Sequence, residues 1–299
     1  QIALVHSIFN ISTTLILLPF IRVLEKLAYL TIPVSEKEKQ AVEDMEFQVL
    51  DDRFLQTPAF AIEQCRSLAN QMAQLSEECF FKAMQSLTDF SKETIEEVIA
   101  LENKIDVYQD KLSNYLTKLS SRNLAYQDGQ NVSMLLHCIT DMERISDHAV
   151  NVAESAQTMQ KRNLSFSKKA TEEMNVYRNA MQDILNQTVQ AFIYGDEHQA
   201  MSVEPLEEVI DKLNKNIKKR HVRRLRKGKC TIDLGLILSD VATNFERVAD
   251  HCSNIAVYLI QEQDTDLEAH SYVNHLREDD NSFERQVAIL EEKYSLGKK

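Results

Sequence analysis

Hydrophobic positions recur every three or four residues along most of the chain, which is the period of one helix face. The predicted helices cover residues 59–87, 91–120, 130–160, 166–194, 197–227 and 231–263, with one more in the tail around 282–294. Gln127–Gly129 is predicted to form a turn before the third helix. Ser91 is a good helix N-cap, and Gly195 and Gly228 stand where helix C-caps are expected. We therefore expect an all-α protein built from two tandem three-helix bundles.

An internal repeat sets the domain organisation. Leu101–Asp106 aligns with Leu206–Asp211 at an offset of 105, and Thr140–Asn151 aligns with Thr243–Asn254 at an offset of 103. A period near one hundred residues fits a duplicated small domain better than a solenoid. The predicted domains are copy 1 at 50–162, copy 2 at 163–264 and a helical tail at 265–299.

The chain opens on an apolar run. Residues 2–21 contain no formal charge and would form a helix of roughly 30 Å, the thickness of a bilayer core. Arg22 and Lys26 follow, so the positive-inside tendency places later residues in the cytoplasm. We expect residues 1–32 to be the last transmembrane helix of a truncated membrane domain and 33–49 to be a linker.

That run also supports other interpretations. A signal peptide would have a basic start and a small-residue cleavage site, which are missing from the sequence. A buried helix of a soluble protein stays open. If the run spans a membrane, the protein is expected in the cell inner membrane, with residues after about 32 in the cytoplasm. His6 and Asn10 are then candidate residues of a transport path.

Composition narrows the class of protein. Five glycines and four prolines are too few for a turn-rich β fold, and the net charge of −12 argues against a nucleic-acid partner. The five cysteines have no CxxC spacing and read as reduced thiols.

Acidic pairs mark the candidate site. A Glu and an Asp four residues apart lie on one face of a helix, and the repeat contains four such pairs: Glu102/Asp106, Glu143/Asp147, Glu207/Asp211 and Glu246/Asp250. They fall beside the apolar stripe, where a neighbouring helix can add ligands. Carboxylate oxygens suit Mg, Mn, Ca or Fe, whereas a zinc site would contain more His and Cys. A solvated face is the alternative. His148 and His251, one residue after each Asp, are interpreted as partly exposed structural residues.

On these residues the chain resembles the PhoU family, whose duplicated three-helix bundles carry the Glu/Asp-x-x-x-Asp pattern. The resemblance implies multinuclear metal clusters, with iron as the most expected metal, at the eight carboxylates. Asp141 is replaced by Asn244 in the second copy, so the resemblance does not imply equal metal occupancy.

The first residues resemble the end of the membrane part of a bacterial Na⁺/phosphate cotransporter, through His6-x-x-Phe9-Asn10 and Leu18-Pro19-Phe20. This implies the C-terminal fragment of a sodium-dependent phosphate transporter that carries a regulatory domain. The implied partners are phosphate and Na⁺ through the missing upstream part, membrane lipid, and a second copy or a phosphate-signalling protein.

Two other functions compete. A membrane-tethered adaptor in phosphate signalling would have no transport activity of its own. A di-iron oxidase would use Glu-x-x-His, which the chain lacks, so we do not expect an enzyme. The basic run at 212–229 either contacts anionic lipid or complements the helix dipole.

Overall fold

The computed structural model describes residue 6, residues 45–263 and residues 281–297, and the chain divides into two units, Gln1–Val49 and Leu50–Lys299. Apart from His6, the predicted transmembrane segment and most of the predicted linker therefore lie outside the described residues. Within the second unit, every regular element of the described residues is helical.

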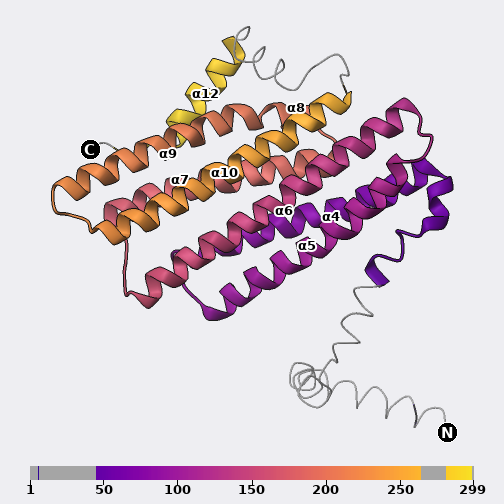
Figure 1. Ribbon diagram of the computed structural model, residues 1–299. Helices are drawn as coiled ribbons and strands as arrows, with labels where there is room; N and C mark the ends of the chain where they lie inside the picture. Colours follow the sequence, from indigo (N-terminus) through magenta and orange to yellow (C-terminus); the bar gives the residue numbers. More distant parts are fainter. Residues whose placement is uncertain (1–5, 7–44, 264–280, 298–299) are drawn as a thin grey trace. The chain divides into compact units, whose positions relative to one another are not determined.

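Copy 1 contains three long helices: α4 (Pro58–Ser86), α5 (Lys92–Ser120) and α6 (Tyr126–Lys161), preceded by a short 3-10 helix, η2 (Asp52–Gln56). Pro58 occupies the first turn of α4, where its missing N–H costs no hydrogen bond. The three helices pack side by side (Figure 1). Their buried side chains include Phe80, Tyr108 and Leu135.

Copy 2 repeats the arrangement with α7 (Lys168–Tyr194), α9 (Val203–Arg226) and α10 (Ile232–Gln263). Gly195 has a φ of 62° and caps α7, while Gly228 has a φ of 65° just after α9, so both predicted helix ends are confirmed. The tail helix α12 (Asn281–Lys293) packs against α9 (Figure 1).

The two copies share one core. Helix α6 packs along α10, and α4 packs against α7. The ring of Phe245 lies edge-on to Phe80 at 5.5 Å between centroids and to Tyr177 at 5.1 Å, and all three side chains are buried. The Tyr177 hydroxyl donates to the carbonyl of Ala242 at 3.2 Å, which satisfies its one buried polar group.

Two local predictions are wrong. Gln127–Gly129 was expected to form a turn, but α6 already begins at Tyr126, and the N–H of Gly129 donates to the carbonyl of Ala125 at 3.0 Å. The segment after Gly195 is not one helix, because a short α8 (Glu197–Met201), capped by Asp196, precedes α9. The turn predicted at Gly129 does not form, because one glycine in a polar stretch does not break a helix whose following turns are buried.

Candidate metal centre

Helices α5 and α6 bring the copy 1 carboxylates together. Ile105 and Tyr108 on α5 and Ile145 on α6 are buried in the shared core. That packing fixes the rotation of both helices and leaves the Glu-x-x-x-Asp pairs at the edge of the buried stripes.

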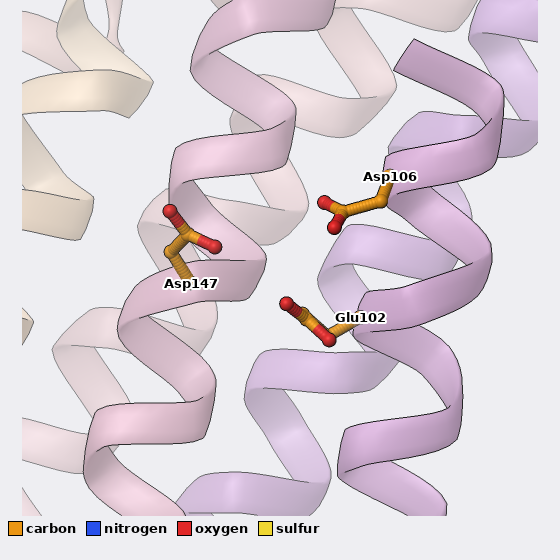
Figure 2. Close-up of side chains that lie close together, drawn as sticks. All are labelled: Glu102, Asp106 and Asp147. Carbon is orange, nitrogen blue, oxygen red and sulfur yellow. The ribbon is translucent and has the colours of Figure 1, made fainter. Parts of the chain in front are cut away.

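Three carboxylates converge between these helices. Glu102, Asp106 and Asp147 each offer an oxygen, and the three oxygens lie within 4.8 Å of one another (Figure 2). Oxygens on opposite sides of an ion bound at about 2.0–2.6 Å are separated by about 4–5 Å. The spacing therefore fits one hard cation. It contains no His or Cys and so does not fit a structural zinc site.

Negative charge at this cluster is poorly compensated. The pKa of Glu102 is raised by burial and then by Asp106 and Asp147, and the pKa of Asp106 is raised by burial, Asp147 and Asp110. The pKa of Glu143 is raised by burial and by Asp147, against a smaller lowering by Arg144. Among the described residues, none of these carboxylates forms an ion pair. Like charges at this distance favour a bound cation.

Copy 2 places its four carboxylates at the matching positions, Glu207 and Asp211 on α9 and Glu246 and Asp250 on α10. The pKa of Asp250 is raised by burial and by Glu246. However, of the described residues only the copy 1 trio meets the 4.8 Å spacing.

Two lysines lie beside the carboxylates of copy 2. Lys215 Nζ lies 2.9 Å from Asp211 Oδ2, and Lys218 Nζ lies 3.9 Å from Glu246 Oε2. Asn214 also donates to Glu246. Copy 1 has Asp110 and Ser113 at the positions of the two lysines, at the 105-residue offset. This difference between the copies is visible in the sequence when the two turns that follow Asp106 and Asp211 are aligned.

The histidines of the two motifs join the copies. His251 Nδ1 lies 2.7 Å from Asp141 Oδ1, and His148 Nδ1 lies 2.8 Å from Asn244 Oδ1. The two imidazole rings stack at 5.6 Å. His251 is buried, with 8% of its surface exposed, so its interpretation as partly exposed is wrong. Both histidines are bonded across the interface between copies.

Of the other predicted site residues, Asn10 lies outside the described residues and His6 is exposed.

A family model for the PhoU domain matches residues 69–156 and 177–259, which is more than half of the chain and covers both copies. The chain belongs to the PhoU domain family. The match begins inside α4 and ends inside α10, so it includes all eight carboxylates of the four pairs.

Similar proteins agree with this assignment. The PhoU-family chain is 24% identical to the phosphate-specific transport system accessory protein PhoU homolog 1 of Thermotoga maritima, over 65% of this chain and 84% of that protein. It is 21% identical to the homolog of Clostridium acetobutylicum, over 69% and 95%. The crystal structure of PhoU from Pseudomonas aeruginosa superposes with a TM-score of 0.63 at 23% identity, over 67% of this chain and 96% of that one. That likeness shows the shared fold.

The comparisons contradict the location predicted from the sequence. That prediction placed the chain in the inner membrane, with residues after about 32 in the cytoplasm. The chain spans nearly the whole length of relatives named accessory proteins of a transport system. Within the described residues, no helix is both long and apolar enough to cross a bilayer, because charged side chains recur along the exposed face of each long helix.

Proposed function

We propose that this PhoU-family chain is a regulatory adaptor of phosphate transport, with neither transport activity nor catalytic activity of its own. The supporting observation is the PhoU match across both copies, together with 84% and 95% coverage of relatives named phosphate-specific transport system accessory proteins. The partners would be proteins of the phosphate transport or signalling machinery. Self-association stays a prediction.

The metal part of the proposal rests on copy 1. Glu102, Asp106 and Asp147 would hold a divalent or trivalent cation, with Glu143 beside them. Iron is expected from the family resemblance, and the oxygen donor set also fits Mn, Mg or Ca. When bound, the cation would supply a positive charge that holds α5 and α6 together. It could also be coordinated by an oxygen of phosphate or of a partner's carboxylate.

A genetic experiment tests the adaptor role. The chain is expressed in cells that lack their own phosphate importers and, separately, in cells that keep the importers but lack their PhoU regulator. We expect no restored phosphate uptake in the first strain and a changed response of a phosphate-controlled reporter in the second. Restored uptake in the importer-free strain would overturn the proposal.

A metal analysis tests the site. Purified wild-type protein is compared with Glu102→Gln/Asp106→Asn/Asp147→Asn, and a matched control carries Glu207→Gln/Asp211→Asn/Asp250→Asn. Both variants change the charge by the same amount. We expect the copy 1 variant to lose most of its metal in elemental analysis and the copy 2 variant to keep it. Equal retention by both variants would count against the assignment.

The narrower prediction, a C-terminal fragment of a sodium-dependent phosphate transporter, stays a prediction. Its motifs lie at residues 6–20, outside the matched ranges and, apart from His6, outside the described residues. Restored phosphate uptake in the importer-free strain would support this narrower reading.

A further inference from the structure

A basic hollow lies on the copy 2 side of the helical unit, away from the carboxylate cluster. It has a volume of about 860 Å³, within the range of about 300–1,000 Å³ that small-molecule sites occupy. Its walls are the first turns of α7, the last turns of α9 and residues Leu296 and Gly297 after α12. Seven cationic side chains line it: Lys168, Lys169, Arg220, Arg223, Arg224, Lys227 and Lys229.

Two arginines of the hollow are fixed in place. Glu173, with 8% of its side chain exposed, accepts from Arg224 Nη1 at 2.6 Å and from Arg220 Nη1 at 3.4 Å. Arg220 also donates to the carbonyls of Leu296 and Gly297 at 3.0–3.1 Å. Held in this way, the guanidinium groups are pre-organised, which lowers the entropic cost of binding a ligand.

The lining also contains the carboxylate Glu172, so its seven cationic side chains exceed its two carboxylates, Glu172 and Glu173, by five. Among the described residues, Lys168, Arg223 and Lys227 have no side-chain hydrogen bond or ion pair. Arg224 also has two buried donor atoms, Nε and Nη2, without an acceptor there. Buried donors without acceptors are rare and call for an explanation.

Helix stability does not explain this arrangement. The helix dipole favours cations in the last turn of α9, but it disfavours Lys168 and Lys169 in the first turn of α7. Arg220 and Arg224, and likewise Arg223 and Lys227, are like charges four residues apart, which destabilises a helix. The whole chain carries a net charge of −12, so the cluster of cations does not reflect a generally basic composition.

We infer that this hollow binds a soluble anion with two or more phosphate groups, such as a polyphosphate or a nucleoside triphosphate. The fork of an arginine matches phosphate oxygens, and lysines from a second helix face the same space. The cations line a concave site rather than one flat face, which favours a small soluble ligand over a bilayer surface. The inference is independent of the proposed adaptor role and of the metal site.

Calorimetric titration of the full chain with sodium tripolyphosphate tests the inference, with inorganic phosphate as a second probe. The test variant is Lys168→Gln/Arg223→Gln/Lys227→Gln, since these side chains have no structural partner. The matched control, Lys92→Gln/Arg122→Gln/Lys161→Gln, removes three exposed cations elsewhere. Thermal unfolding checks that both variants fold. We expect saturable tripolyphosphate binding by wild type, weaker binding of phosphate, and a loss of tenfold or more for the test variant only, as expected for about 1.4 kcal/mol or more of lost charge-assisted hydrogen bonding.

Three results would overturn the inference. One is the absence of saturable tripolyphosphate binding by wild type, and another is an equal loss in both variants, which would indicate general charge attraction. The third concerns lipid headgroups as the phosphate source. If vesicles of phosphatidylglycerol and phosphatidylcholine bind the wild type and control but not the test variant, while tripolyphosphate binds none of them, the hollow contacts lipid instead.

Discussion

His251 of α10 is hydrogen-bonded to Asp141 of α6 across the interface between the two copies, with 2.7 Å between Nδ1 and Oδ1. The related pair, His148 and Asn244, is separated by 2.8 Å. The two His pairs therefore have the same geometry but different charge, because the acceptor is a carboxylate in one pair and an amide oxygen in the other.

The Asp141→Asn substitution tests the contribution of this pair. Asp141 has 6% of its surface exposed and accepts from Asn254 Nδ2 at 3.4 Å as well as bonding to His251. Asparagine keeps the shape but weakens a bond to a charged group, so we expect the free energy of unfolding in urea to fall by about 1–2 kcal/mol. The control is Asp240→Asn at an exposed position of α10, with an expected change within about 0.5 kcal/mol. Equal values for the two variants would contradict the role of the pair.

The metal-free protein should gain stability as the pH falls from neutral. The pKa values of Glu102, Asp106 and Glu143 are raised in the folded state, in each case first by burial. Between the ordinary and the raised pKa values the folded state binds more protons than the unfolded state, so the free energy of unfolding rises with acidification. Urea unfolding in the presence of a chelator, at pH values from 7 to 5, measures this slope.

The matched comparison for that slope is Glu102→Gln/Asp106→Asn/Asp147→Asn. Its neutral side chains do not titrate, so its stability should depend less on pH over the same interval. Saturating metal should reverse the sign in wild type, because protons compete with the cation for the carboxylates. A slope that is the same in wild type and in the variant would show that other groups determine it.

Converting the copy 2 site to the copy 1 pattern should create a second metal position. The change is Lys215→Asp/Lys218→Ser, which removes the lysines beside Asp211 and Glu246 and installs the residue types of Asp110 and Ser113. We expect more metal bound per chain in elemental analysis. The control, Lys92→Asp/Lys161→Ser, makes the same charge change away from both sites. If it raises the metal content equally, added negative charge alone is the cause.

Thiol reactivity should be confined to one residue. Burial raises the pKa of Cys65, Cys79 and Cys252 to about 12, so these thiols stay protonated near pH 8. Cys138 is also buried, whereas Cys230 is half-exposed. We expect one fast-reacting thiol per folded chain with an aromatic disulfide reagent, and five in guanidinium chloride. The Cys230→Ser variant should show none, and several fast thiols in folded wild type would contradict the burial of the others.

Most of the fold was predictable from local patterns. Apolar period predicts the bounds of five long helices within a few residues and the end of the sixth, α9, because each helix buries one continuous stripe. Gly195 and Gly228 follow the ends of α7 and α9 in the left-handed conformation that glycine adopts readily. The turn at 127–129 failed because buried positions further along α6 outweigh one glycine. The short α8 has too few residues to show a period.

The sequence predicts the residue types of the candidate site but not the difference in spacing and charge between its two copies. Spacing places Glu102 and Asp106 on one helix face, yet their approach to Asp147 depends on how α5 packs on α6. The lysines of copy 2 are visible in the sequence but acquire meaning only beside Asp211 and Glu246. Similarly, the basic run at 212–229 gave no indication that Lys168 and Lys169 face the same hollow.

The placement of Phe245 between Phe80 and Tyr177 has a consequence for how the polypeptide can be divided. Each repeat covers an apolar face of the other, so a truncation in the connection between α6 and α7 would leave two fragments with exposed hydrophobic surface. The two repeats therefore stabilise each other, and we expect them to unfold together as a single cooperative unit.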